Sequence, residues 1–361
     1  MTVNETIASY QLVRLNSSKY FEMCWNQTDL DSNLSSFDVL DTSFVYSKSE
    51  AYVAGFVNGV QSIVGTILNM LVIIALLRNS ELRKQPLTPS IISISITDLL
   101  FSGYILSVAT IHWFSADMPS TSDCQIFAFV LYGLWLCSAL NLVGIAVIRL
   151  LVVYFPWKYK ATNRKKRFWI LPLLGWLISV IWLIPTLIGV FGQFGFECRT
   201  FKCRFINVNK GTGGIKINPE RTFSMMVLSI GTILLVLNIA TYLKLKMKSK
   251  AAYDSIRENK DRAAIKRVHA REKKVERMVV IVTTSFFVVY MPMVVLRNID
   301  PNAMITRRTS YIFCYLCTCL VGVIDPLVYI ICQESYRNEI KDMFQNVIYI
   351  KLNTKSHDNN T

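Results

Sequence analysis

The sequence predicts an all-α membrane protein, a seven-transmembrane helix bundle with a short amphipathic interfacial helix after the seventh span. Its 361 residues are 52% hydrophobic and 17% charged, with a mean hydropathy of +0.37, which is too apolar for a soluble domain of this length. Seven runs are long and apolar enough to cross a bilayer. The Lys and Arg residues fall mainly between these runs, as they do in the loops of membrane proteins.

The expected spans are residues 52–77, 90–111, 126–153, 168–191, 222–243, 278–296 and 311–332. They divide the chain into a tail over 1–50, a transmembrane domain over 51–333, and an amphipathic helix with a short tail over 334–361. In that last segment, ESYRNEIKDMFQNV alternates acidic, basic and apolar residues. This pattern is typical of a helix that lies at the membrane interface.

The charges of the connections predict the orientation. Residues 78–84 hold three basic residues against one acid, residues 154–167 hold six against none, and residues 244–277 hold thirteen against five. By the positive-inside rule these loops and the C-terminus are cytoplasmic. The tail agrees, because its N-x-S/T sequons can be glycosylated only on the outer side of the membrane. These sequons begin at Asn4, Asn16, Asn26 and Asn33. We therefore expect a multi-pass plasma-membrane protein with an extracellular N-terminus.

Several function classes are disfavoured. The net charge of +15 does not indicate a nucleic-acid partner, since the basic residues form no continuous face with interleaved aromatics. No phosphate-binding loop, zincin motif or hydrolase elbow is present, and the three histidines lack ligand spacing, so we expect neither an enzyme nor a metal site. A transporter or channel remains an alternative because intramembrane acids also line ion pathways, although the sequence shows no inverted repeat.

The strongly polar side chains within the apolar spans include those of Asn69, Asp98, Arg149 and Asp325. Such residues pair with neighbours or mark functional sites, because an unpaired charge in the bilayer costs several kcal/mol. Arg149 is either a functional residue or a marker of the cytoplasmic helix end. Asp98 either belongs to an ion or signal pathway or forms a simple hydrogen bond between helices. Helical spacing from Arg149 predicts one inward-facing row, made of Ala128, Leu131, Trp135 and Ser138.

Cysteines lie on the expected extracellular side at the start of the third span and in the loop before the fifth. Cys124 is the first of these, and Cys198 and Cys203 lie in the loop. Because this compartment is oxidising, we expect a bridge from the third span to the loop. The basic segment after the fifth span is either a helical continuation or a solvated loop.

The ordered polar residues, prolines and cysteines resemble the markers of rhodopsin-like (class A) G-protein-coupled receptors over residues 52–346. The matching positions are Asn69, Asp98, Cys124, Arg149, Trp176, Tyr242, Pro292, and Asp325, Pro326 and Tyr329 of DPLVY. Within this family, the IRL triplet and LRNSELRKQPLTPSIISISITDLLF are most similar to the invertebrate moody and trapped-in-endoderm orphan receptors.

Three positions depart from the family pattern. The D/E-R-Y triplet reads Ile148-Arg149-Leu150, so the arginine lacks its neighbouring carboxylate. Tyr290 replaces the tryptophan two residues before the proline of the sixth span, and Leu234 replaces the proline of the fifth. Because of this altered triplet, an atypical receptor that scavenges ligand or recruits arrestin without activating a G protein remains an alternative.

The resemblance implies an extracellular ligand and a heterotrimeric G protein as partners, with arrestin, a receptor kinase and membrane lipids as further ones. It assigns the switch to Arg149, Tyr242, Glu272 and Tyr329, with Arg149 paired to Glu272 at rest. It assigns the central network to Asn69, Asp98, Ser138 and Asp325. No cofactor is required, but two nearby carboxylates either hold Na⁺ as an allosteric ion or share a proton. The resemblance also selects Cys203 as the partner of Cys124.

The ligand pocket expected from the family's spacing is mainly aromatic and apolar, with one cation near its rim. Its residues are Leu131, Tyr132, Trp135, Tyr290, Met293, Arg297, Tyr311 and Tyr315. Leu131 stands where amine receptors carry an aspartate, and Cys319 stands where light-sensing members carry their lysine, so amine and retinal ligands are disfavoured. A lipid or an apolar acid suits this lining, although an aromatic stripe at helical spacing is also what an ordinary core shows.

Overall fold

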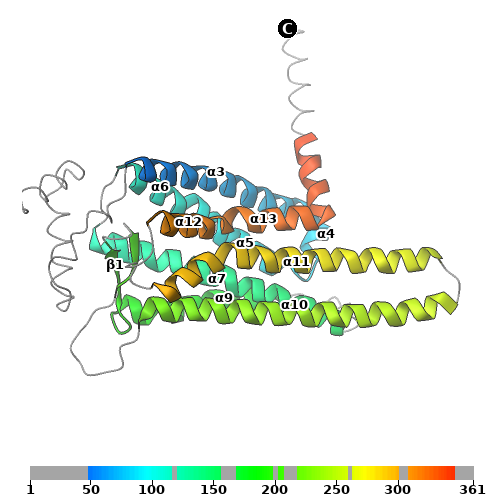
Figure 1. Cartoon of the computed structure of the whole chain (residues 1–361). Coiled ribbons are helices and arrows are strands. Elements are labelled where there is room, and N and C mark those ends of the chain that lie inside the picture. The colour runs from blue at the N-terminus through cyan, green and yellow to red at the C-terminus, as the bar shows by residue number, and fades with distance from the viewer. Residues whose placement is uncertain are drawn as a thin grey trace, which may run out of the picture.

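The computed structural model describes residues 48–115, 120–155, 168–197, 202–206, 218–258, 262–300 and 308–345. Long helices lie side by side along one direction, and a two-stranded hairpin lies at one end of the bundle, which we call the hairpin end (Figure 1). At the opposite end, α10 and α11 extend past the other helices (Figure 1).

The helices occur in the order that the apolar runs predict. They are α3 (Lys48–Arg78), α4 (Ser80–Arg83), α5 (Thr88–Leu100), η3 (Phe101–Ile105), α6 (Leu106–Ser115), α7 (Thr121–Tyr154), α9 (Ile170–Leu187), α10 (Pro219–Glu258), α11 (Arg262–Ile299), α12 (Arg308–Cys319) and α13 (Val321–Cys332). Six spans are long and apolar enough to cross a membrane, and α12 with α13 forms a seventh that is bent by 40°. Residues 334–345 form the further helix expected after the seventh span.

The fifth and sixth spans continue beyond their apolar parts. The sequence places these spans at 222–243 and 278–296, whereas α10 has 40 residues and α11 has 38. Their charged parts cover 244–258 and 262–277, so most of the basic segment between the two spans is helical. Because a helix rises about 1.5 Å per residue, each charged part extends its helix by roughly 20 Å.

The helix α7 lies at the centre of the bundle and α9 lies at its edge. In α7, 61% of the most apolar window is buried, against 28% in α9. The inward-facing row predicted from Arg149 is confirmed, because Ala128, Leu131, Trp135 and Ser138 are all buried. The central helix therefore presents one buried face from the hairpin end to Arg149.

The second span is interrupted by a π-helical turn, η3. There the Leu106 amide donates to the Phe101 carbonyl, five residues back. The Ser102 carbonyl, which would accept this amide in a regular α-helix, instead accepts the Ser62 hydroxyl of α3 at 2.7 Å. A buried carbonyl that lacks an intrahelical donor is thus satisfied by the neighbouring helix.

Asn69 supports the bent seventh span in a similar way. Pro326 has no amide hydrogen, so the Gly322 carbonyl four residues before it loses its helical donor. The Asn69 side-chain amide of α3 donates to that carbonyl at 2.8 Å, and also to the Gly65 carbonyl at 2.9 Å. The polar residue in the first span therefore satisfies the backbone that the proline leaves open.

Two glycines allow α3, η3 and α13 to approach one another closely. A Cβ on Gly65 would lie 2.4 Å from the Ser102 hydroxyl and 3.1 Å from the Gly322 carbonyl oxygen. A Cβ on Gly322 would lie 2.2 Å from the same hydroxyl. The two distances to the hydroxyl are too short for real contacts, so a larger residue at either position would force Ser102 or the helices to move.

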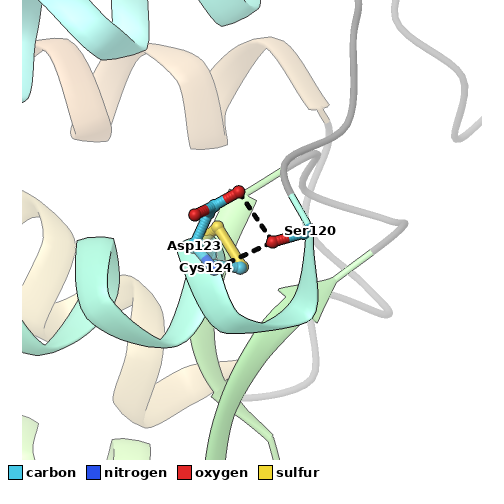
Figure 2. Close-up of a disulfide and its surroundings, with 4 residues drawn as sticks. Ser120, Asp123 and Cys124 are labelled. Atoms are coloured by element: carbon cyan, nitrogen blue, oxygen red, sulfur yellow. Dashed lines mark hydrogen bonds between the residues drawn. A yellow bond between two sulfur atoms is a disulfide. The ribbon is translucent and has the colours of Figure 1, made fainter.

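The disulfide predicted from the resemblance is present. Cys124 near the start of α7 is bonded to Cys203 of the hairpin, with 5.3 Å between their Cα atoms. Figure 2 shows how the helix begins there, with Ser120 as its N-cap. The Ser120 hydroxyl donates to the Asp123 carboxylate at 2.6 Å and accepts the Asp123 amide at 3.1 Å. This capping interaction fixes the turn that carries Cys124.

Candidate functional site

The hairpin packs into the hairpin end of the bundle through its apolar residues. Strands β1 (Gln193–Glu197) and β2 (Lys202–Ile206) are antiparallel, with Phe194 opposite Phe205. The Phe194 side chain is 2% exposed and the Phe205 side chain is 4% exposed. Cys203, between Lys202 and Phe205 in β2, is anchored to α7 by the disulfide. The hairpin is therefore part of the protein core.

Tyr132 is the centre of the aromatic cluster that the hairpin joins. Its ring lies 4.4 Å from that of Phe205 and 6.0 Å from that of Phe194, measured between centroids. The ring of Phe223 in α10 lies 5.0 Å away and that of Trp135 lies 5.7 Å away. Each such pair stabilises by about 0.5–1.5 kcal/mol beyond its buried area. The cluster joins α7, α10 and the hairpin.

The eight residues expected in the pocket all occupy buried positions on α7, α11 and α12. They are Leu131, Tyr132, Trp135, Tyr290, Met293, Arg297, Tyr311 and Tyr315. The spacing thus identifies a shared inward face, and the hairpin covers part of it through its contacts with Tyr132. Their role in binding a ligand stays a prediction.

Arg297 does not lie at an open rim, as the sequence suggests, because it is 6% exposed and paired. Its Nε lies 3.0 Å from Oε1 of Glu220, and its Nη2 donates to the Tyr132 hydroxyl at 3.2 Å. Arg204 of β2 forms a second ion pair with Glu220. The carboxylate, 2% exposed at the start of α10, is thus shared by arginines from β2 and α11. Burial of these charges requires such pairing.

Three of the four residues predicted for the central network lie together midway along the bundle, whereas the fourth, Asn69, donates to backbone carbonyls instead. The Ser138 hydroxyl lies 3.4 Å from Oδ1 of Asp98 and 3.4 Å from Oδ2 of Asp325. All three side chains are buried, and Oδ2 of Asp98 has no hydrogen-bond partner in the described part of the chain. Two carboxylates and a hydroxyl are oxygen ligands of the kind that a hard cation prefers, so these residues fit Na⁺.

Within the described ranges, no group of three or more His, Cys, Asp or Glu side chains is placed to hold a metal ion.

Arg149 lies toward the opposite end of α7 and is only 8% exposed. Among the described residues, none accepts a hydrogen bond from its guanidinium. Its neighbour Ile148 is fully buried. Glu272, the expected partner, lies in α11, but its side chain is outside the described residues. The expected pair therefore stays a prediction.

The other two expected switch residues occupy different environments. Tyr329 of α13 is 2% exposed, and its hydroxyl has no hydrogen-bond partner within the described ranges. Tyr242 of α10 is half-buried, with the Lys246 ammonium 6.0 Å from its ring centroid. At the same end, the Lys248 ammonium donates to the Val153 carbonyl of α7 at 2.5 Å. The basic end of the fifth span thus contacts the central helix.

The helix over 334–345 is attached to the connection between the first two spans. Glu339 accepts a hydrogen bond from the Asn79 amide at 3.0 Å and pairs with the Arg78 Nε at 3.5 Å. Tyr336 is 1% exposed, and burial raises the pKa of its hydroxyl above the ordinary value. Phe344, by contrast, is exposed, as expected of an amphipathic helix.

Among the described residues, five cysteines are free, namely Cys137, Cys314, Cys317, Cys319 and Cys332. Cys24, Cys198 and the sequons at Asn4, Asn16, Asn26 and Asn33 lie outside the described residues.

The comparisons with known proteins agree with this arrangement. The family model described as "7 transmembrane receptor (rhodopsin family)" matches residues 68–329, most of the helical bundle. The chain belongs to this family. It is a multi-pass membrane protein with the seven-transmembrane fold of a G-protein-coupled receptor. This membership decides against the transporter or channel that the intramembrane acids left open.

Similarities to individual proteins support the narrower placement. Protein trapped in endoderm-1 of Drosophila melanogaster is 24% identical over 317 residues, which cover 82% of this chain and 78% of that protein. The G-protein coupled receptor moody of the same species is 23% identical over 342 residues, covering 77% of this chain but only 49% of the relative. The crystal structure of squid rhodopsin has a TM-score of 0.68 at 17% identity, covering 84% of this chain and 87% of that one. These similarities confirm a rhodopsin-like receptor of the moody and trapped-in-endoderm group.

Sequence reasoning missed the residues that the hairpin and the helix ends bring to the pocket. Phe194, Phe205, Arg204 and Glu220 lie outside or at the margin of the apolar spans. The alternating patterns in QFGFE and KCRFI are signals for two short strands. An acid at the start of an apolar span, as Glu220 is, was a signal for a buried ion pair.

Proposed function

We propose that this protein is a plasma-membrane receptor that binds an extracellular ligand at the hairpin end and activates a heterotrimeric G protein at the opposite end. The basic loops support a cytoplasmic opposite end, and the sequons support an extracellular N-terminus. One observation carries the proposal: a single central helix, α7, bears Tyr132 of the pocket, Ser138 of the acid network and Arg149 of the opposite end, all buried. A shift of this helix would bias both ends together.

The ligand class that the pocket supports is a lipid or an apolar acid. Aromatic and apolar residues dominate the predicted lining, and Leu131 offers no charge to an amine. Arg297 is the cation for an acidic headgroup, which would take the place of Glu220. Because the ligand then competes with an existing ion pair, its binding would loosen the contact between α10 and α11.

The central network would link ligand binding to the switch. Na⁺ held by Asp98, Ser138 and Asp325 would stabilise the resting arrangement, because it neutralises two carboxylates that approach the same hydroxyl. At rest, Glu272 would hold Arg149, and release of Arg149 would open the G-protein site. Loss of the adjacent acid at Ile148 leaves Glu272 as the principal restraint.

The test is a ligand screen on cells that express the full chain. Lipids, small carboxylic acids and peptides are applied, and G-protein dissociation and arrestin recruitment are measured in parallel. A lipid or acid that triggers G-protein dissociation, with a weaker response in Arg297→Gln, supports the proposal. Arg221→Ala, at an exposed arginine near the start of α10, is the matched control for loss of charge.

A ligand that recruits arrestin without G-protein dissociation would instead indicate the atypical receptor. That second candidate is favoured by Ile148 and Leu150, which replace the usual companions of Arg149.

A further inference from the structure

Three aromatic rings near the hairpin end surround the ammonium group of Lys202. Its Nζ lies 3.1 Å from the ring centroid of Tyr315, 4.9 Å from that of Tyr311 and 5.9 Å from that of Trp113. These distances are within the range in which the faces of aromatic rings attract a cation. All three rings are buried, and so is the ammonium nitrogen itself.

The cage belongs to the helical bundle, whereas the cation within it belongs to the hairpin. Trp113 lies on α6 and both tyrosines lie on α12. Trp113 packs with Ala54 of α3 and Ile312 of α12 in a separate buried cluster. The rings are thus held by packing among the helices, so the cage persists if the lysine leaves.

Lys202 is able to leave without unfolding the hairpin. The disulfide at Cys203 anchors the backbone next to it, so the flexible side chain can rotate out of the cage while the strand stays in place. The residue as a whole is half-buried although its ammonium nitrogen is buried, so another part of Lys202 reaches the surface. A ligand would reach the cage along the path that the lysine side chain occupies.

We propose that Trp113, Tyr311 and Tyr315 form a binding subsite for the alkylammonium group of a ligand, and that Lys202 fills this subsite until the ligand displaces it. An alkylated ammonium suits the cage better than lysine does, because a primary ammonium is strongly hydrated and costs more to bury. The subsite differs from the amine site of the family at position 131, where Leu131 carries no charge.

The inference deepens the proposed function and rests on it only for the claim that the subsite serves an extracellular ligand. A lipid with a quaternary ammonium headgroup would fill the cage with its cation and the adjoining aromatic pocket with its chain. Binding in the cage is measurable without a G protein, so its failure and the failure of G-protein activation are separate results.

The test uses the purified full chain and tetramethylammonium chloride as the probe, with sodium chloride at equal concentration as the reference. Thermal unfolding is followed by intrinsic fluorescence in the wild type, Lys202→Ala, Lys202→Ala/Tyr315→Leu and the control Arg221→Ala. We expect a saturable rise in Tm for Lys202→Ala, with a Kd about tenfold or more below that of the wild type. The double variant should show no rise, and the control should behave as the wild type.

Absence of a saturable rise in Lys202→Ala would overturn the inference, and so would an equal rise in the double variant. If Lys202→Ala does not fold, Lys202→Gln provides the same comparison, because it removes the charge and keeps most of the stem. A rise in all variants alike would mean a general effect of the salt and would also overturn it.

Discussion

Glu220 offers the sharpest test of how the hairpin end is held together. Its carboxylate is 2% exposed and is shared by Arg204 of β2 and Arg297 of α11. Glu220→Gln keeps the size and shape of the side chain but removes the charge. The two arginines then lose the carboxylate that compensates them, while their own positions remain buried.

The expected loss follows from the burial of the three side chains. Removing one partner of a buried ion pair costs about 3–5 kcal/mol, because a charge stays in a low-dielectric environment without its counter-charge. For a chain of 361 residues, with an unfolding entropy of about 2.1 cal/mol/K per residue, the loss corresponds to a Tm lower by roughly 4–7 °C. Thermal unfolding of the purified chain measures this shift, with Glu334→Gln, an exposed acid after α13, as the matched control.

The coupling within the triad is measured by a double-mutant cycle. If Glu220 and Arg297 interact as the structure shows, Arg297→Gln added to Glu220→Gln costs less than Arg297→Gln alone, by about 1 kcal/mol or more. A Tm for Glu220→Gln within about 2 °C of the wild type, or strictly additive losses, would refute the buried triad.

Three further predictions address the rest of the bundle. Gly65→Ala should lower the free energy of unfolding by about 1–3 kcal/mol, because its Cβ would lie 2.4 Å from the Ser102 hydroxyl. Gly103→Ala is the control and should be tolerated, since the nearest neighbour of its Cβ would be 3.5 Å away. Equal Tm values for the two variants would contradict this expectation. Glu272→Ala should raise basal signalling through release of Arg149, and unchanged basal G-protein and arrestin readouts would count against the pair. Asp98→Asn should abolish the Na⁺ dependence of ligand affinity, and binding that is insensitive to Na⁺ in the wild type as well would exclude the ion site.

Much of the architecture was predictable because apolar composition and loop charge are strong local signals. Four features of the structure agree with the sequence interpretation: the seven spans, the inward-facing row of α7, the Cys124–Cys203 bridge and the helix after α13. The breaks were not predicted. The π-turn η3 shows no proline or glycine pattern that would mark it uniquely, and its buried Ser102 carbonyl accepts a hydrogen bond from Ser62, 40 positions earlier in the sequence.

The pocket was predicted only in part, because helical spacing identifies which face a residue occupies but not what packs against it. Arg297 was placed on the correct face, yet its partner Glu220 lies on another helix, 77 positions earlier in the sequence. Likewise, Tyr311 and Tyr315 were expected to face a ligand, but nothing in the chain order indicated that Lys202 would lie between them and Trp113. Such contacts depend on how the hairpin folds back into the bundle.

Ligand-stimulated G-protein dissociation, compared between the wild type and Arg149→Ala at equal surface expression, tests the central claim most directly. The account predicts dissociation in the wild type and a response at least about tenfold weaker in the variant, because the variant loses one charge-assisted contact to the G protein. Arrestin recruitment by the same ligand without G-protein dissociation in the wild type would contradict the account, and so would full dissociation in Arg149→Ala.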